Sequence, residues 1–131
     1  MNRAAFSALA DQEFADLPAA LLGWVDNVVF LVEDWPDRET LDDLGIEHRP
    51  DLLGLYQGNP LTERSVEWGG QLPDRIVLYQ RPIEYWARAD GMSVADVIRE
   101  TLVHEIGHHL GLDEEQLERL EAREAAAPGT P

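Results

Sequence analysis

The chain has 131 residues, enough to bury a hydrophobic core, so we expect a single domain over residues 1–131. It carries 26 acidic residues against ten basic ones, all of them arginine, and the net charge of −16 disfavours binding to the phosphate backbone of nucleic acids. Because the sequence has no cysteine, it excludes disulfides and thiolate metal ligands, so a metal site must use nitrogen and oxygen donors.

The apolar segments are too short for a membrane protein. No segment approaches the roughly 20 consecutive apolar residues that a membrane-spanning helix needs. Residues 1–11 contain only a short alanine-rich run before acidic residues follow, which is too little for the apolar region of a signal peptide. We therefore expect a cytoplasmic protein with no membrane partner.

The N-terminal part predicts a helix followed by a strand. Apolar residues recur at helical spacing from Ala4 to Leu22, which predicts an amphipathic helix that breaks near Pro18. The β-branched and aromatic run Val28–Val32 is typical of a strand buried on both faces, so we place it at the centre of a sheet. The charged segment Asp37–Arg49 follows, and we predict irregular structure there.

Two further strands are predicted in the middle of the chain. The first, Leu52–Gln57, is short, and a loop rich in glycine, asparagine, proline and threonine follows it. The second, Arg75–Gln80, is halted by Pro82. From Pro82 to Ala89 the sequence predicts a helical turn or two, which ends at an Asp-Gly pair.

A long helix is predicted to start after Ser93. Ser93 is the expected N-cap, and Asp96 three residues later completes a capping-box pattern. Apolar residues form one stripe along this helix, and His104 and His108 lie in the stripe beside it. Gly111 is expected to end the helix in a left-handed conformation.

The C-terminal part predicts a second, shorter helix. Asp113 is expected to cap a helix from Glu114 to about Ala126, and residues 125–131 are predicted to form a frayed tail. The resulting order is an N-terminal helix, strands, a long helix and a C-terminal helix. This order predicts an α+β fold with a small sheet.

Residues 104–108 read HEIGH, which matches the HExxH pattern of zinc peptidases. Residues four apart lie on one face of a helix with Cβ atoms about 5–6 Å apart, so His104 and His108 can bind one cation. Glu105 lies on the adjoining flank, where its carboxylate can reach a water on that cation without occupying a coordination position. The motif therefore predicts two metal ligands and a general base.

The run HEIGHHLGLDEE, together with LLGLYQGNPLTERS and LPDRIVLYQRP upstream, resembles the small bacterial zincin-like metallopeptidase family. The resemblance spans most of the chain. It implies a minimal zincin-like fold with a small mixed sheet, one catalytic zinc ion and peptidase activity, and it does not imply a known physiological substrate.

A catalytic zinc ion usually has three protein ligands, so a third must be found. In the metzincin pattern HExxHxxGxxH, a glycine lets the chain turn and brings the third ligand six residues after the second histidine. Here Gly111 occupies the glycine position and Glu114 the ligand position, and Asp113 is the alternative. The family that the sequence resembles also has an acid there, more often aspartate. Both methionines, Met1 and Met92, precede the motif, so the Met-turn of an ordinary metzincin is missing.

The remaining histidines and downstream glutamates are expected to be structural. A gluzincin takes its third ligand from a later helix, but for Glu118, Glu121 and Glu124 we expect a solvated helix face. His109 is expected either to pack against neighbouring residues or to donate a hydrogen bond to one of the metal-binding side chains. His48 is expected on the surface.

The leading hypothesis is zinc-dependent hydrolysis of a peptide or unfolded protein, with Glu105 as general base. The segment Leu53–Gln57 is a candidate edge strand that could bind an extended peptide by β-augmentation. One alternative is a non-catalytic, metal-stabilised binding module. A metal-dependent endoribonuclease is less favoured. One bacterial ribosome-maturation family has a similar histidine spacing, but it has no need of Glu105 and must bind RNA.

Overall fold

The structure, a computed structural model, describes residues 1–23, 25, 27–58 and 73–125, with side chains as far as Leu120. Most of the loop predicted after Gln57 (59–72) and the end of the predicted tail (126–131) lie outside the described residues. In chain order the elements are α1 (Arg3–Ala15), α2 (Ala19–Leu22), β1 (Val28–Glu33), α3 (Arg38–Leu44), the 3-10 helix η1 (Arg49–Asp51), β2 (Gly54–Gln57), β3 (Asp74–Tyr79), α5 (Gln80–Asp90), α6 (Val94–His109) and α7 (Glu114–Ala125).

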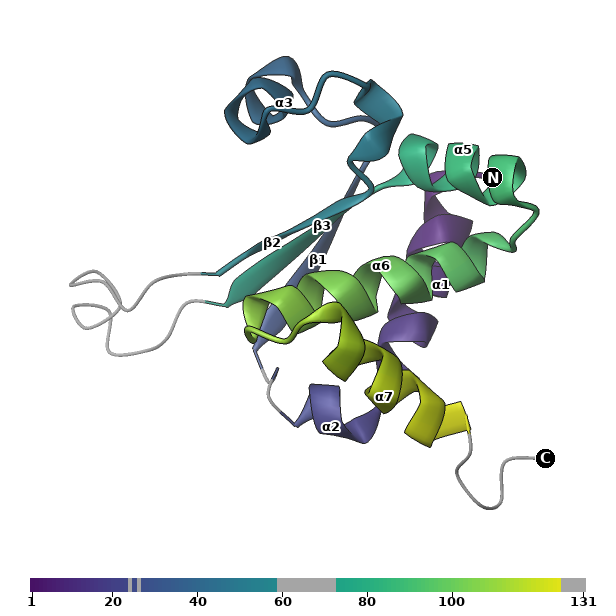
Figure 1. The fold of residues 1–131 in the computed structure, drawn as a ribbon. Helices are drawn as coiled ribbons and strands as arrows, with labels where there is room; N and C mark the ends of the chain where they lie inside the picture. Colours follow the sequence, from purple (N-terminus) through teal and green to yellow (C-terminus); the bar gives the residue numbers. More distant parts are fainter. Residues whose placement is uncertain (24, 26, 59–72, 126–131) are drawn as a thin grey trace.

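The elements form an α+β fold in which helices pack against a small mixed sheet (Figure 1). The strand order is β1-β3-β2, with β1 parallel and β2 antiparallel to β3. The central strand is β3, and its residues Ile76 and Leu78 are fully buried. The short strand β2 lies at an edge, as predicted from the sequence.

The prediction that Val28–Val32 forms the central strand, buried on both faces, is wrong. These residues form β1, which lies at the other edge of the sheet, and Val29 and Leu31 are 41% and 40% exposed. The alternate residues Val28, Phe30 and Val32 pack against the main core. An apolar run thus marks the strand correctly, but here it is covered on one face only.

The prediction of irregular structure for Asp37–Arg49 is also wrong, because α3 lies within this segment. The Asp37 side chain caps the helix by accepting a hydrogen bond from the Thr40 amide at 2.7 Å. Gly45 ends it in the left-handed conformation with φ 69°. Leu41 is the apolar contact, because it packs with Val77 and Tyr79 on the second face of the sheet.

The remaining helices follow the sequence closely. The break predicted near Pro18 separates α1 from α2. Pro82 lies in the first turn of α5, where a helix tolerates a residue without an amide N–H, so the helix begins two residues before the predicted start. Among the described helices, none combines the length and the apolar character that crossing a membrane requires.

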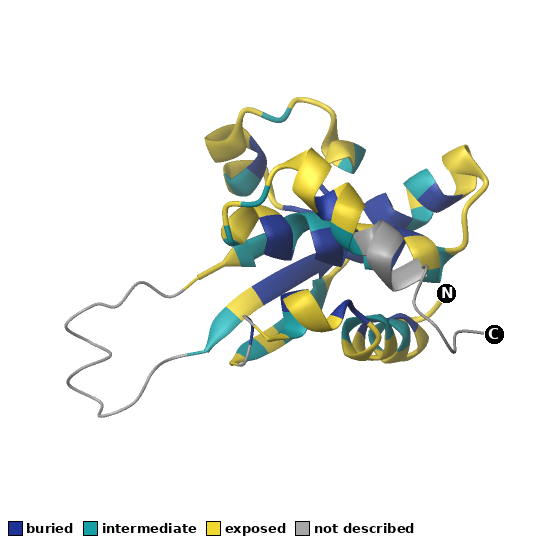
Figure 2. Ribbon diagram, turned by 60° about the horizontal axis from the view of Figure 1, so that its bottom comes forward, coloured by how far each residue is buried: buried dark blue, intermediate teal, exposed yellow. Residues whose placement is uncertain are grey.

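The main core lies between the sheet and α1 and α6, and buried residues fill this layer (Figure 2). The predicted apolar stripe of α6 is confirmed, because Ile98, Leu102 and Ile106 are fully buried. Gly54 lets β2 approach this helix, since a Cβ atom there would lie 2.8 Å from Thr101 Cγ2. The close contact brings the edge strand beside the residues of the HEIGH motif.

Candidate active site

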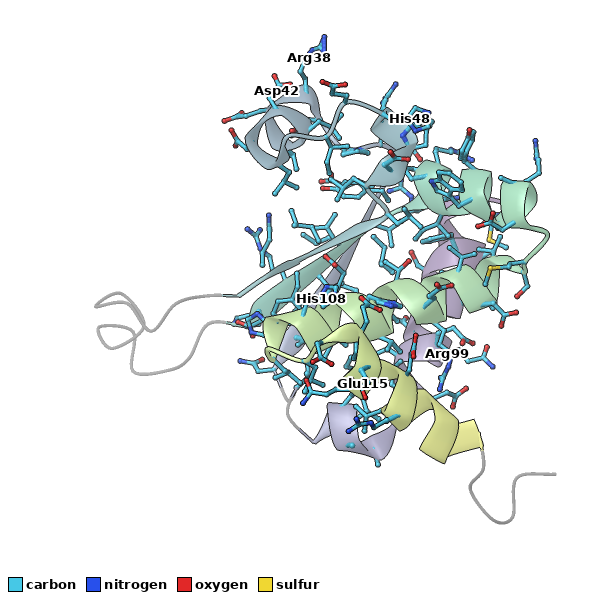
Figure 3. The ribbon with its side chains drawn as sticks, viewed as in Figure 1. Arg38, Asp42, His48, Arg99, His108 and Glu115 are labelled. Atoms are coloured by element: carbon cyan, nitrogen blue, oxygen red, sulfur yellow. The ribbon has the colours of Figure 1, made fainter. Side chains whose placement is uncertain are left out.

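The two motif histidines lie near the C-terminal end of α6, on the flank beside its buried stripe. Ser93 caps the helix by accepting a hydrogen bond from the Asp96 amide at 3.0 Å. This cap fixes the residue at which α6 begins and therefore the face on which each later residue lies. The rings of His104 and His108 have centroids 5.9 Å apart, and both are partly exposed. Figure 3 shows His108 on the last turns of α6, close to the start of α7.

The turn after α6 gives Asp113 and Glu114, the two candidate metal ligands, different hydrogen-bond partners. Gly111 adopts φ 82°, a left-handed conformation, and the chain reverses into α7. Asp113 caps α7: its Oδ1 accepts the Gln116 amide at 2.8 Å, while Gln116 Oε1 accepts the Asp113 amide at 2.9 Å. Its side chain is thereby committed to the backbone of the new helix.

Glu114, the next residue, contacts both histidines. Its Oε2 lies 2.9 Å from His104 Nε2, and its Oε1 lies 3.1 Å from His108 Nε2. The structure therefore brings together the three side chains that the motif and its glycine turn single out.

The hydrogen bond of His104 to a backbone carbonyl determines which of its two ring nitrogens carries the proton in the neutral state. Its Nδ1 lies 2.8 Å from the Glu100 carbonyl oxygen, so Nδ1 donates a proton there. In a neutral ring Nε2 then carries a lone pair that faces the Glu114 carboxylate. Two acceptors at this distance require a cation between them, which is either a proton or a metal ion.

The pKa values of this pair agree with that requirement. Partial burial acts to lower the pKa of His104, but hydrogen bonds to the Glu100 carbonyl and to Glu114 outweigh it and raise the pKa. The same contacts, with His104 first and His108 second, lower the pKa of Glu114. The two shifts favour a protonated His104 beside an ionised Glu114.

The three side chains have the donor chemistry that a zinc ion needs, because two imidazoles and one carboxylate are a common ligand set of catalytic sites. In this structure the Glu114 carboxylate is hydrogen-bonded to each of the two histidines. Within the described part of the chain, no group of three or more His, Asp or Glu side chains is spaced to hold a metal ion. The hydrogen bond from His104 Nδ1 to a backbone carbonyl is typical of a metal-binding histidine. Glu114 is exposed, so its side chain can change rotamer without repacking the core.

Glu105 lies between His104 and His108 in the sequence, and its side chain is partly buried. Burial raises the pKa of its carboxyl, and a hydrogen bond from the Tyr56 backbone amide and the charges of His108 and His104 oppose that rise. A partly buried carboxylate with a raised pKa is suited to accept and return a proton. The motif predicted Glu105, but it gave no indication that an amide of β2 holds it.

The other two histidines lie outside the group of His104, His108 and Glu114. The His109 ring stacks on Tyr56 with centroids 3.9 Å apart, so it is a packed residue between α6 and β2. His48 is exposed and pairs with Asp51 at 2.9 Å, as expected of a surface histidine, and Figure 3 shows it far from His108.

A cleft of about 480 Å³ opens between β2, α5 and α6 and reaches the motif. Its lining includes Leu53 and Gly54 from the edge strand side, Trp86 from α5, and Thr101, His104 and Glu105 from α6. A second hollow of about 430 Å³ lies on the other flank of His104, beside Glu114 and Leu117 of α7. His104 lines both cavities, as Met92 and Glu100 also do.

Comparison with known proteins identifies a family for this chain. No curated protein matches the sequence. A family model described as zincin-like metallopeptidase matches residues 25–124, a range that runs from just before β1 through nearly all of α7. The match includes the HEIGH motif, the glycine turn and Glu114, and such a family implies zinc binding and hydrolase activity. The chain belongs to the zincin-like metallopeptidase family.

Proposed function

We propose that the protein is a zinc-dependent peptidase in which His104, His108 and Glu114 hold one catalytic zinc ion and Glu105 is the general base. The observation that carries the proposal is the convergence of Glu114, from a different helix, on the Nε2 atoms of both motif histidines. Asp113, the alternative ligand, is engaged in capping α7. Family membership supports the same metal and the same class of reaction.

When bound at this site, zinc supplies Lewis acidity toward a water molecule and toward the scissile carbonyl. Glu105 accepts a proton from the attacking water as the water oxygen bonds to the carbonyl carbon. The same carboxyl then delivers that proton to the amine nitrogen as the carbon–nitrogen bond breaks, so its proton balance is restored after each cycle. A carboxyl pKa raised by burial suits it for both steps.

The edge strand β2 is suited to bind the peptide backbone. The Tyr79 amide donates to the Leu53 carbonyl at 2.9 Å, so alternation along an antiparallel pair turns the backbone groups of Gly54 and Tyr56 away from β3. The Tyr56 amide is hydrogen-bonded to the Glu105 carboxylate, so the Gly54 amide and carbonyl are the groups of β2 proposed to pair with a peptide. Gly54 lines the cleft together with His104 and Glu105. An extended peptide that pairs with β2 would therefore pass across the motif.

This binding mode selects a substrate by its conformation. Hydrogen bonds to the backbone groups of a strand are available to any extended sequence, whereas a folded protein has already used its own backbone groups. We infer that the substrate is an unfolded segment or a short peptide. The apolar walls of the cleft, which include Trp86 and Leu53, favour a substrate side chain with a substantial apolar part.

The test uses the purified chain loaded with zinc and an intrinsically unfolded probe, fluorescein-labelled casein. We expect one zinc ion per chain by atomic emission and zinc-dependent cleavage of casein. Glu105→Gln should keep the metal and lower the cleavage rate by about 10²–10⁴-fold, the usual contribution of a general base.

The matched control is Glu115→Gln, which removes the same charge from an exposed position paired with Arg119 and should cleave casein at the wild-type rate. A zinc-loaded wild-type chain that leaves both casein and a peptide library intact would contradict peptidase activity and favour a metal-stabilised binding module. A chain that cannot be loaded with zinc would contradict both.

A further inference from the structure

Tyr56 makes three separate contacts that join β2, β3 and α6. Its backbone amide is hydrogen-bonded to the Glu105 carboxylate. Its hydroxyl donates to Asp74 Oδ2 at 2.6 Å, and its ring stacks on the His109 imidazole with an interplanar angle of 20°. His109 Nε2 in turn lies 3.9 Å from the same Asp74 oxygen. The Tyr56 side chain is therefore held by Asp74 of β3 and by His109 of α6, while its backbone amide is hydrogen-bonded to Glu105, the proposed base.

The arrangement follows from the sheet register and from the length of α6. Tyr56 pairs with Ile76, so Asp74, two residues earlier on β3, presents its side chain on the same face. The last residue of α6, His109, lies over that face. Gly58 permits the approach, because a Cβ atom there would lie 2.8 Å from His109 Cε1.

We propose that Tyr56, Asp74 and His109 form a positioning cluster that orients the Glu105 carboxylate through the Tyr56 amide. The role of Glu105 as general base rests on the proposed function. The hydrogen bond between the Tyr56 amide and the Glu105 carboxylate does not depend on it. None of the three side chains is assigned contact with the substrate or the metal. They act by fixing the distance between β2 and the helix that carries the base.

The geometry favours this role over a contribution to stability alone. Asp74 and His109 are partly exposed, and their 3.9 Å approach adds little to the free energy of folding. The Tyr56–Asp74 hydrogen bond is short, at 2.6 Å, so it restricts where the tyrosine ring and its backbone can lie in addition to any contribution to stability. Small displacements at a catalytic group are costly, since a shift of about 1 Å can lower a rate by about 100-fold.

The first test measures hydrogen exchange of the Tyr56 amide by NMR in the metal-free chain. That amide faces away from β3, so its protection depends on the Glu105 carboxylate. We expect Glu105→Ala, Tyr56→Phe and Asp74→Ala each to accelerate its exchange at least about tenfold. Asp74→Asn keeps an oxygen acceptor and should restore protection. Tyr85→Phe, which alters an exposed tyrosine of α5, is the matched control and should change nothing.

The second test measures casein cleavage by the same variants loaded with zinc. Tyr56→Phe and Asp74→Ala should lower kcat about tenfold and change KM less than about twofold, because a neighbouring group that orients a catalytic residue typically contributes 10–100-fold. Asp74→Asn should recover most of kcat. A purely structural role would lower the amount of folded protein and would not separate kcat from KM in this way.

The outcomes distinguish the two proposals. Wild-type exchange of the Tyr56 amide in Tyr56→Phe and Asp74→Ala would overturn the positioning cluster, whether or not the protein cleaves casein. Faster exchange with an unchanged kcat in an active enzyme would overturn its catalytic relevance. If wild-type protein fails to cleave casein, the proposed function fails, and the exchange rates still decide whether the cluster controls the Glu105 contact.

Discussion

At the scale of single residues, the site depends on two adjacent carboxylates that do different work. Asp113 satisfies the backbone of α7, whereas Glu114 carries its charge back to the imidazoles of α6. An aspartate at 114 would have one methylene less with which to reach both rings. The use of glutamate fits a turn in which the preceding residue is already committed to helix capping.

A second residue-scale feature, the cap of α3, predicts a pH-dependent stability. Hydrogen bonds from the Thr40 side chain and the Thr40 amide lower the pKa of Asp37. A lowered folded-state pKa means that the stabilisation is present above the usual aspartate pKa and is lost as pH falls through the lowered value. We expect Asp37→Ala to reduce the urea midpoint at neutral pH, by an amount that shrinks in acid.

Asp37→Asn is the control for this prediction, because asparagine also caps helices but does not titrate. It should unfold near the wild-type midpoint at neutral pH, and its difference from Asp37→Ala should be independent of pH. An Asp37→Ala deficit that persists undiminished at acid pH would show that the carboxylate is not the stabilising group.

The residues of the candidate site were partly predictable from sequence for a physical reason. His104, Glu105 and His108 lie within one helical turn or so, and helical geometry alone determines that they share a region of surface. The choice between Asp113 and Glu114 depended on which side chain the backbone of α7 recruits, which spacing does not reveal. Tyr56 was not predictable as a partner of Glu105, because the contact uses a backbone amide, a group that nearly every residue type has.

At the scale of elements, the site depends on the close packing of α6 and α7. Gly107 lies on the buried side of α6, and a Cβ atom there would approach Leu117 Cδ2 to 2.2 Å and Leu117 Cγ to 3.0 Å. The absence of a side chain at 107 therefore lets α7 pack close to α6. That contact keeps Glu114, at the start of α7, within reach of the two histidines.

Gly107→Ala should therefore destabilise the protein, although the same change in an unobstructed helix stabilises it by about 0.5–1 kcal/mol. We expect a loss of about 1–3 kcal/mol, the usual cost of overpacking a core, measured as a lower urea midpoint. Gly23→Ala is the matched control. Its backbone is right-handed and its nearest contact is the Ala19 carbonyl at 3.4 Å, so it should be neutral or slightly stabilising. A stabilised Gly107→Ala would contradict the packing account.

Caps and prolines marked the ends of several elements correctly, whereas hydrophobicity alone misplaced one strand and a lack of apolar residues hid one capped helix. Ser93 and Gly111 bracket α6 and its turn, and Pro18 separates two helices, as expected. The position of β1 in the sheet was wrong because an apolar run reports burial without saying how many faces are covered. The helix α3 was missed although Asp37 and Gly45 supply a cap at each end.

At the scale of the whole molecule, the sheet and α6 position the edge strand against the motif. The core between the sheet, α1 and α6 fixes the helix (Figures 1 and 2). The strand β2 contributes to one wall of the cleft. Composition and motif order predicted the α+β class and the family, because both depend on patterns along the chain. The cleft was not predictable, since it depends on the distance between β2 and α5, which are separated by β3 and by residues 59–72.

The most direct test of the account is a crystal structure of the zinc-loaded Glu105→Gln chain, with diffraction data collected on both sides of the zinc absorption edge. We predict one anomalous peak, with His104 Nε2, His108 Nε2 and a Glu114 carboxylate oxygen each about 2.0–2.2 Å away. The substituted side chain at position 105 should remain outside the coordination shell. A peak coordinated by Asp113 or Glu118 in place of Glu114, or no peak at the two histidines, would contradict the proposed metal centre.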